Sequence, residues 1–125
     1  MIKFLHIRQI DEKNNILPQG GMTIAYTKTL DEVMFNVARC HLEYDNYCRR
    51  VGREIAVNRM RKFGPEDVIP LTHPVTEGLV NWISNSYFDV PIEIKRLGKH
   101  WVSNFGRSFY DALARIGNTS VKETD

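Results

Sequence analysis

Basic side chains are concentrated between residues 49 and 62, at positions where they could bind an anionic partner. These side chains are Arg49, Arg50, Arg53, Arg59, Arg61 and Lys62. An arginine presents its N–H donors in a planar fork that matches the oxygens of phosphate and carboxylate groups. The last three residues also fall where cations stabilise the negative end of a predicted helix. We therefore place the candidate binding site at Arg49, Arg50 and Arg53, although Arg50 is also spaced to pair with Glu54.

A second basic group, Lys95, Arg96 and Lys99, accompanies aromatic residues such as Trp101 and Phe105. Basic and aromatic residues together are typical of surfaces on which single-stranded nucleic acids stack. The aromatic residues, however, recur every three or four positions, which is the spacing of a buried helical stripe. The sequence therefore predicts that the basic residues form an exposed patch that assists the first group, while the rings belong to the core.

Residues of the metal-binding types are few and irregularly spaced. The nearest candidates are Cys40, His41, Cys48 and His73. They do not repeat the paired spacing of zinc sites, so we predict no metal and no cofactor. A metal-dependent nuclease would have to use His41, Glu43 and Asp45 around one cation. No glycine-rich phosphate loop or nucleophile elbow accompanies them, so the sequence favours a binding protein over an enzyme.

The net charge of +2 conceals an uneven distribution of charge along the chain. Residues 44–63 carry six basic and two acidic side chains, net +4, and residues 92–118 carry net +3. Between them, residues 64–91 carry four acidic side chains and no lysine or arginine. The acidic segment is suited to solubilising loops, but it could also bind the basic segments of a second copy. A homodimer therefore stays an open alternative.

Length and composition predict one packed domain. The chain has 125 residues, of which 42% are hydrophobic, which is enough for one core. No run approaches the roughly 20 apolar residues of a membrane span, and the charged N-terminal residues are unlike a secretory signal. The two cysteines do not form a disulfide framework. We expect a cytoplasmic protein with reduced thiols and no membrane partner.

Periodicity and turn residues predict the elements that position these groups. Strands are expected at 2–10, 22–28 and 33–40, with the last two forming a hairpin. Helices are expected at 45–63, from 74 to about 88, and at 92–116, with a loop at 64–73. Asp45 should cap the first helix and Gly64 should end it. The prediction is an α+β domain over residues 1–118, a three-stranded antiparallel sheet packed by about three helices, with a flexible polar tail at 119–125.

Part of the chain resembles a known pattern. The segments are GGMTIAY at 20–26, VARC at 37–40, DNYCRRVGREIA at 45–56 and RM at 59–60. Together they resemble small uncharacterised accessory proteins of tailed bacteriophages, over about a third of the chain. No established activity and no binding residues come with this resemblance. It implies a protein made in the cytoplasm of a bacterial host, where such accessory proteins often bind host factors or nucleic acid.

Gly52 completes the candidate site, because a glycine in mid-helix is tolerated where the backbone must approach a sheet or a ligand closely. Two functions fit the pattern. The first is an inhibitor or modulator that binds a host nucleic-acid-handling or defence complex through the basic helix. The second is direct binding of DNA or RNA, and the metal-dependent nuclease is a third, weaker alternative.

Overall fold

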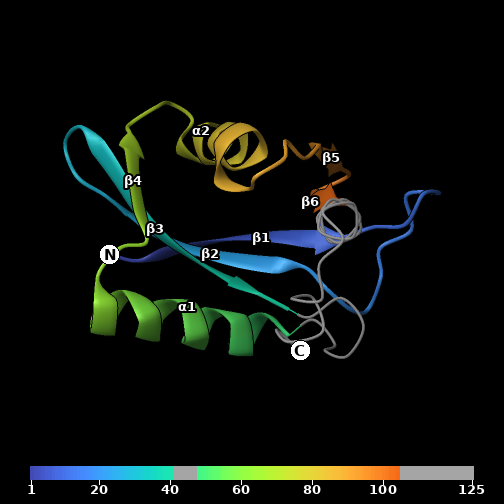
Figure 1. The fold of residues 1–125 in the computed structure, drawn as a ribbon, viewed down its shortest axis with the longest axis horizontal. Coiled ribbons are helices and arrows are strands. Elements are labelled where there is room, and N and C mark those ends of the chain that lie inside the picture. The colour runs from blue at the N-terminus through green and yellow to red at the C-terminus, as the bar shows by residue number, and fades with distance from the viewer. Residues whose placement is uncertain (41–47, 105–125) are drawn as a thin grey trace.

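The computed structural model describes residues 1–40 and 48–104. Their elements, labelled in Figure 1, follow one another along the chain as strands, a helix, a short strand, a second helix and a hairpin. The bounds are β1 (Lys3–Gln9), β2 (Met22–Lys28), β3 (Glu32–Arg39), α1 (Arg49–Phe63), β4 (Asp67–Pro70), α2 (Val75–Trp82), the π-helical turn η1 (Ile83–Tyr87), β5 (Ile94–Leu97) and β6 (His100–Ser103).

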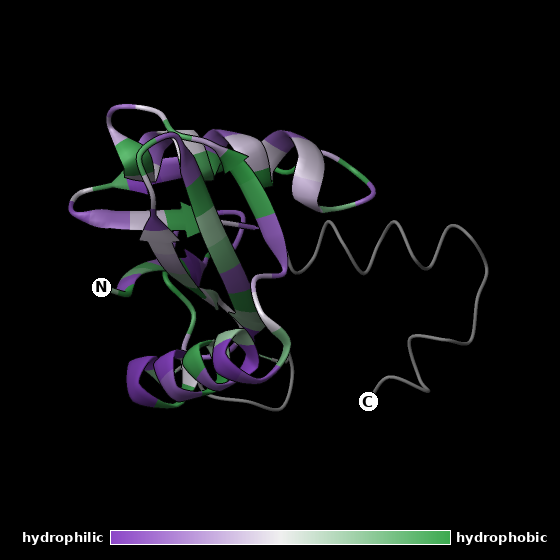
Figure 2. Cartoon of the chain, turned by 90° about the vertical axis from the view of Figure 1, so that its left-hand side faces the viewer, coloured by the Kyte–Doolittle hydropathy of each residue, from purple (hydrophilic) through white to green (hydrophobic). Residues whose placement is uncertain are grey.

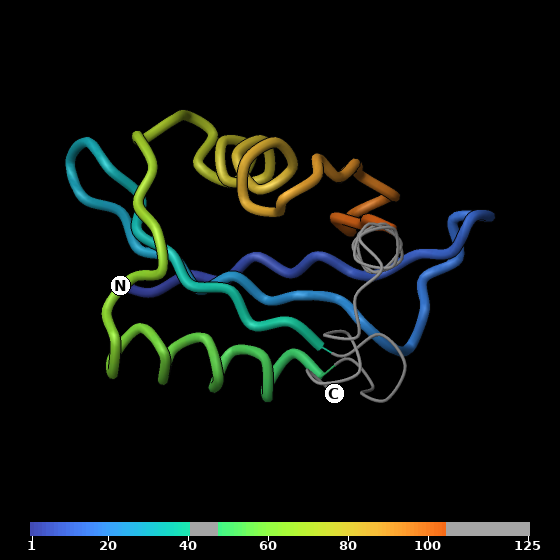
Figure 3. The backbone as a smooth tube through the Cα atoms, viewed as in Figure 1, coloured from blue at the N-terminus to red at the C-terminus, as the bar shows by residue number. Residues whose placement is uncertain are grey.

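The strands form one six-stranded sheet in the order β4-β3-β2-β1-β6-β5. Neighbouring strands are antiparallel except β1 and β6, which run parallel. In Figures 1 and 3, α1 lies along one face of this sheet, and α2 with η1 lies over the opposite face. The architecture is therefore a mixed sheet between two helical layers, and the fold class is α+β.

The first three strands confirm the predicted N-terminal strand and hairpin. β1 alternates between buried and partly exposed side chains, as a strand with two differently covered faces should. β2 and β3 pair in register from Met22 opposite Arg39 to Lys28 opposite Val33. These strands form the centre of the sheet, so the strongest sequence patterns lie where the fold has its most extensive pairing.

The predicted three-stranded sheet with about three helices is wrong, because the sheet has six strands and the described residues hold two helices. β4 lies in the segment predicted as a loop, and it adds only four residues beside β3. β5 and β6 replace the start of the helix predicted at 92–116. Gly98, with φ 62°, occupies the first position of a two-residue turn between them, where glycine is favoured. The rest of that predicted helix and the predicted tail lie outside the described residues.

Two hydrophobic layers of unequal size hold the helices to the sheet. The larger one lies between the sheet and α2 with η1, and its most deeply buried members include Ile7, Ile24, Phe35, Leu79 and Ile83. The smaller one lies under α1 and consists of Ala25, Ala38 and Ala56 with partly buried neighbours. Figure 2 shows purple bands recurring along α1, which mark the hydrophilic residues of this helix.

Candidate basic interaction surface

The helix α1 rests on the sheet through its smallest residues. Gly52 and Ala56 are its two buried residues, and they face β2 and β3. A Cβ atom added at Gly52 would overlap Thr23 Oγ1 and lie 3.0 Å from Thr23 Cβ. Gly52 is thus needed for close contact between the helix and the sheet, and it lies on the side of α1 that faces the sheet. Within the candidate site, Gly52 determines the distance between the sheet and the helix that carries the arginines.

Arg53 is held by a short polar chain that starts in the sheet. Its Nε donates to His6 Nε2 at 3.1 Å, and His6 Nδ1 lies 3.1 Å from the buried hydroxyl of Thr23. Because an arginine N–H can only donate, His6 Nε2 must carry a lone pair, and the ring proton of the neutral histidine is then on Nδ1. The Arg53 guanidinium also lies 5.0 Å from the centre of the Phe4 ring. Arg53 is therefore oriented by β1 as well as by its own helix.

The protonation of His6 is linked to these arginines. Its pKa is lowered from 6.5 to about 4, first because the ring is partly buried and then because Arg53 and Arg49 place positive charge beside it. Both guanidinium groups therefore lie near the His6 ring, at the middle of β1. A protonated His6 could no longer accept from Arg53, so the polar chain requires the neutral ring.

Arg49 and Arg50 occupy the first turn of α1, and both are exposed. The helix begins after Cys48, which makes no side-chain cap, and its first turn contains no acidic residue. The prediction of Asp45 as the N-cap is thus wrong for a helix that starts at Arg49, and Asp45 itself lies outside the described residues. The predicted pairing of Arg50 with Glu54 is present at 3.8 Å between exposed side chains. Such an exposed pair contributes little stability.

The C-terminal half of α1 uses its basic residues differently. Arg59 Nη1 donates to the main-chain oxygen of Val37 at 2.9 Å, so this arginine fastens the helix to β3. Arg61 and Lys62 lie in the last turn, where cations favour the helix dipole. Gly64 ends the helix as predicted, with φ 79° and its N–H bonded to Met60 O. The structural roles expected for this half are thus consistent with its contacts.

Apolar side chains are also exposed on α1, on the flank away from Arg49 and Arg53, because helix positions two residues apart do not share a face. Val51 and Ile55 are one turn apart and are 43% and 40% exposed. Phe63, at the end of the same helix, is 74% exposed, and the helix carries six basic residues and one acidic residue. We define the α1 surface as Arg49, Arg50, Val51, Arg53 and Ile55. Arginine is one of the residue types enriched at protein interfaces.

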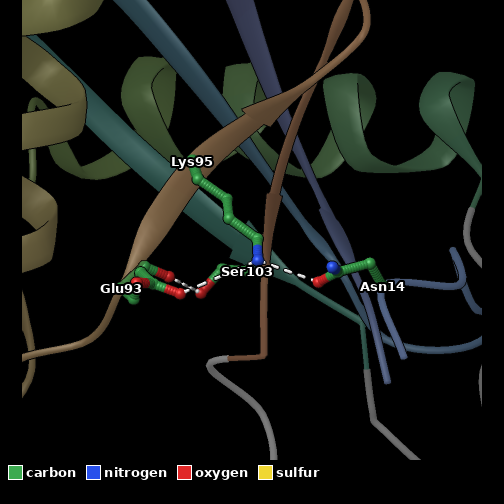
Figure 4. Close-up of polar contacts among 4 residues, drawn as sticks. All are labelled: Asn14, Glu93, Lys95 and Ser103. Carbon is green, nitrogen blue, oxygen red and sulfur yellow. Dashed lines mark hydrogen bonds and ion pairs between the residues drawn. The ribbon is translucent and has the colours of Figure 1, made fainter. Parts of the chain in front are cut away.

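The second basic group does not extend the α1 surface. Lys95 and Arg96 are successive residues of β5, so they point to opposite faces of the sheet, and Lys99 lies in the turn after the strand. β5 is the edge strand farthest from β4, whereas α1 contacts β2 and β3. Figure 4 shows Lys95 Nζ directed to Asn14 Oδ1 at 2.8 Å and towards the Glu93 carboxylate at 4.0 Å. The helical patch predicted for Lys95, Arg96 and Lys99 is therefore not formed.

The structure also contains a polar pocket that the sequence did not predict. It has a volume of about 390 Å³ and lies where β4 begins, beside η1. Glu66 accepts a hydrogen bond from the Tyr87 hydroxyl with one carboxylate oxygen and from the Val37 N–H with the other. Burial, followed by this hydrogen bond and the Glu66 charge, raises the pKa of Tyr87 above its usual range. Glu66 lies in a segment predicted as a loop, and no periodic pattern links it to Tyr87.

The described residues bear on the metal-binding alternative but do not test the nuclease alternative. Within residues 1–40 and 48–104, no three histidine, cysteine or acidic side chains gather as a metal site would require. Cys40 is partly buried and Cys48 is exposed. The proposed nuclease residues His41, Glu43 and Asp45 lie outside the described residues.

Comparisons with known proteins were made at three levels. No protein-family model matches the chain, and no curated protein or solved structure matches it either. In the part of the chain that the structure describes, neither helix has the length and apolar character needed to cross a lipid bilayer. Function is therefore argued from the residues and their geometry.

Proposed function

We propose that this chain is a non-enzymatic accessory protein of the bacteriophage type that modulates a host nucleic-acid-handling or defence complex. In this proposal the α1 surface binds an acidic face of a protein in that complex, inside the host cytoplasm. The single observation that carries the proposal is the exposure of Arg49 and Arg50 on a helix that is seated firmly on the sheet and that also exposes Val51 and Ile55. Arginine is one of the residue types enriched among the hot spots of protein interfaces.

The seating of α1 supports this role because a preorganised surface loses less entropy on binding. Gly52 fixes the distance of the helix from β2, and Arg59 fixes its C-terminal half to β3. Arg53 is oriented by His6 and Phe4 before any partner arrives. Arg49 and Arg50 lie in a first turn where the helix dipole disfavours cations, by about 0.3–1 kcal/mol each. An acidic partner would remove this unfavourable interaction.

The test is an affinity capture of partners from bacterial lysate, with and without nuclease treatment. The proposal expects one protein partner to remain after nuclease digestion. The double variant R49A/R50A should weaken its binding by at least about tenfold, since central arginines are common hot spots. The matched control is R61A/K62A, which removes the same charge from the last turn and should retain the partner. Equal loss in both double variants, or recovery of no protein, contradicts the proposal.

Direct binding of nucleic acid is the second candidate, and one observation favours it. The first turn of α1 combines two arginines with no acidic residue and no side-chain cap from Cys48, and the positive end of a helix suits a phosphate group. In this case the partner disappears after nuclease digestion. Binding to a labelled oligonucleotide should then weaken steeply between 50 and 200 mM salt, with a slope of about one logarithmic unit per phosphate contact. Binding that does not change with salt excludes this candidate.

A further inference from the structure

The two edges of the sheet differ in whether their main-chain groups are available. At the β4 edge, the outward N–H of Val68 donates to Asp67 Oδ1 at 2.8 Å, and Pro70 has no N–H. Beyond the end of β4, the outward N–H of Val37 donates to Glu66 at 3.1 Å, and its carbonyl accepts from Arg59. Side chains and a proline thus close this edge against a further strand.

The β5 edge has no such closure among the described residues. The two-residue turn at Gly98 and Lys99 requires Leu97 and His100 to form a hydrogen-bonded pair, and Lys95 and Val102 then form the next one. By alternation, the N–H and C=O groups of Ile94 and Arg96 point away from β6. Within residues 1–40 and 48–104, no hydrogen bond reaches these outward groups.

The charge beside this open edge is positive. Residues 93–99 carry the three basic residues Lys95, Arg96 and Lys99 and one acidic residue, Glu93. Lys95 is engaged by Asn14 and Glu93, whereas Arg96 and Lys99 are exposed. The Arg96 guanidinium lies 4.8 Å from the centre of the Trp101 ring, which holds it beside the strand. An acidic strand would therefore match both the main-chain groups and the charge of β5.

We propose that β5 is a second binding site, at which an extended acidic segment of a partner protein adds a seventh strand to the sheet. Main-chain hydrogen bonds to Ile94 and Arg96 would supply affinity, and Arg96 and Lys99 would select acidic side chains. The site is independent of the α1 surface, since it uses different residues at another part of the sheet. It assigns the second basic group to strand recognition rather than to a helical patch.

The test uses the full chain and a capped eight-residue peptide of alternating glutamate and valine, followed by NMR. The acidic peptide should slow amide exchange at Ile94 and Arg96 and leave the Val68 amide unchanged. A matched peptide with lysine in place of glutamate should bind several-fold more weakly. Protection centred on Val68, or equal binding of both peptides, overturns the proposal.

Two variants separate the main chain from the charge. R96A removes the guanidinium but keeps the N–H, whereas R96P removes both, and proline is tolerated where a strand N–H faces outward. R96P should bind the acidic peptide roughly two- to tenfold more weakly than R96A, which corresponds to one lost hydrogen bond. Equal affinities of the two variants contradict strand addition.

Two further measurements keep the proposal open to refutation. If proline disrupts the β5–β6 hairpin, the charge-reversal variant R96E keeps the N–H, brings residues 93–99 from net +2 to net 0, and should remove most of the preference for the acidic peptide. An unchanged preference counts against the site. The chain alone is also measured at increasing concentration, and protection of Ile94 and Arg96 without peptide would assign the edge to a second copy and overturn the partner proposed here.

Discussion

On the α2 side of the sheet, large side chains such as Phe35 and Ile24 meet Leu79 and Ile83, whereas on the α1 side a glycine rests against a threonine and alanines rest against one another. Full burial of one large aliphatic or aromatic side chain stabilises a fold by about 1.5–3 kcal/mol, and an alanine buries far less surface. The α2 side therefore supplies most of the hydrophobic stabilisation.

The α1 side has a smaller hydrophobic layer, but its arginine side chains are held in defined positions. Because the helix is close to the sheet, main-chain and side-chain groups of β1 and β3 can reach Arg53 and Arg59 directly. The arginines are thereby held in fixed positions while the outward side of α1 remains exposed. One face of the sheet carries most of the hydrophobic core, and the other carries the helix with the exposed arginines, so changes on the two faces should differ in kind.

The largest effect is expected from Phe35→Ala on the α2 side. Phe35 is fully buried and packs edge-on against Trp82 with ring centres 5.5 Å apart. Its truncation should lower the free energy of unfolding by about 3–5 kcal/mol, through lost burial and a cavity. Urea denaturation measures this loss. A loss as small as that caused by truncating the exposed Ile55 to alanine would show that the core does not lie on the α2 side.

Gly52→Ala should have the next largest effect, by overpacking the α1 side. The added methyl group meets Thr23, so the helix must move away from the sheet, at about 1–3 kcal/mol of stability. The double variant G52A/T23A removes the obstructing hydroxyl and should recover part of the loss. If G52A is as stable as the parent protein, α1 does not lie as close to β2 as described.

A smaller effect is expected from pH through His6. Its pKa is 6.5 in the unfolded chain and about 4 in the folded one, so the unfolded chain binds more protons between these values. Stability should be full above pH 6.5 and fall as the pH is lowered to 4, by about 1–2 kcal/mol, since the half-exposed ring requires discounting for solvent. The difference between the parent protein and H6Q across this range isolates the effect. If the stability of the two proteins changes with pH in parallel, the hydrogen-bonded series from Thr23 through a neutral His6 to Arg53 is contradicted.

The smallest effect concerns the pocket beside β4. Glu66→Gln removes the charge that helps to raise the pKa of Tyr87 above its ordinary 10.0. The pKa of Tyr87 should fall but stay above 10.0, because burial is the larger cause. Titration of tyrosinate absorbance, with Y87F to identify the signal, measures this change. If the pKa of Tyr87 is the same in the parent protein and in E66Q, the Tyr87 hydroxyl does not interact with Glu66.

The sequence predicted the elements whose patterns are local. β2 and β3 alternate in hydrophobicity, and α1 ends at Gly64 and Pro65, so their types were predicted correctly. The hairpin of β5 and β6 was missed because Ile94, Leu97 and Trp101 recur at a spacing that also suits a helix. The pairing of Ile7 with Trp101 decides in favour of strands, and that contact spans almost the whole described chain. Tertiary pairing here overrides local periodicity.

The candidate site was predictable only in part. Arginine composition located Arg49, Arg50 and Arg53, and the close approach at Gly52 followed from its place in a helix. No sequence pattern links Arg53 to His6, which lies 47 positions away, and the closing of the β4 edge by Glu66 and Arg59 is equally non-local. Such contacts arise only after the sheet has assembled.

Under the β5 proposal, the difference between the two sheet edges also limits how many partner segments each chain can bind. With β4 closed by a carboxylate, a proline and an arginine, a chain that accepted a strand at β5 would have no second margin from which the sheet could grow. Each copy could then take one added strand and would act as a terminator of sheet extension. Under the β5 proposal, the complex should be discrete, with one partner segment per chain, rather than an open fibre.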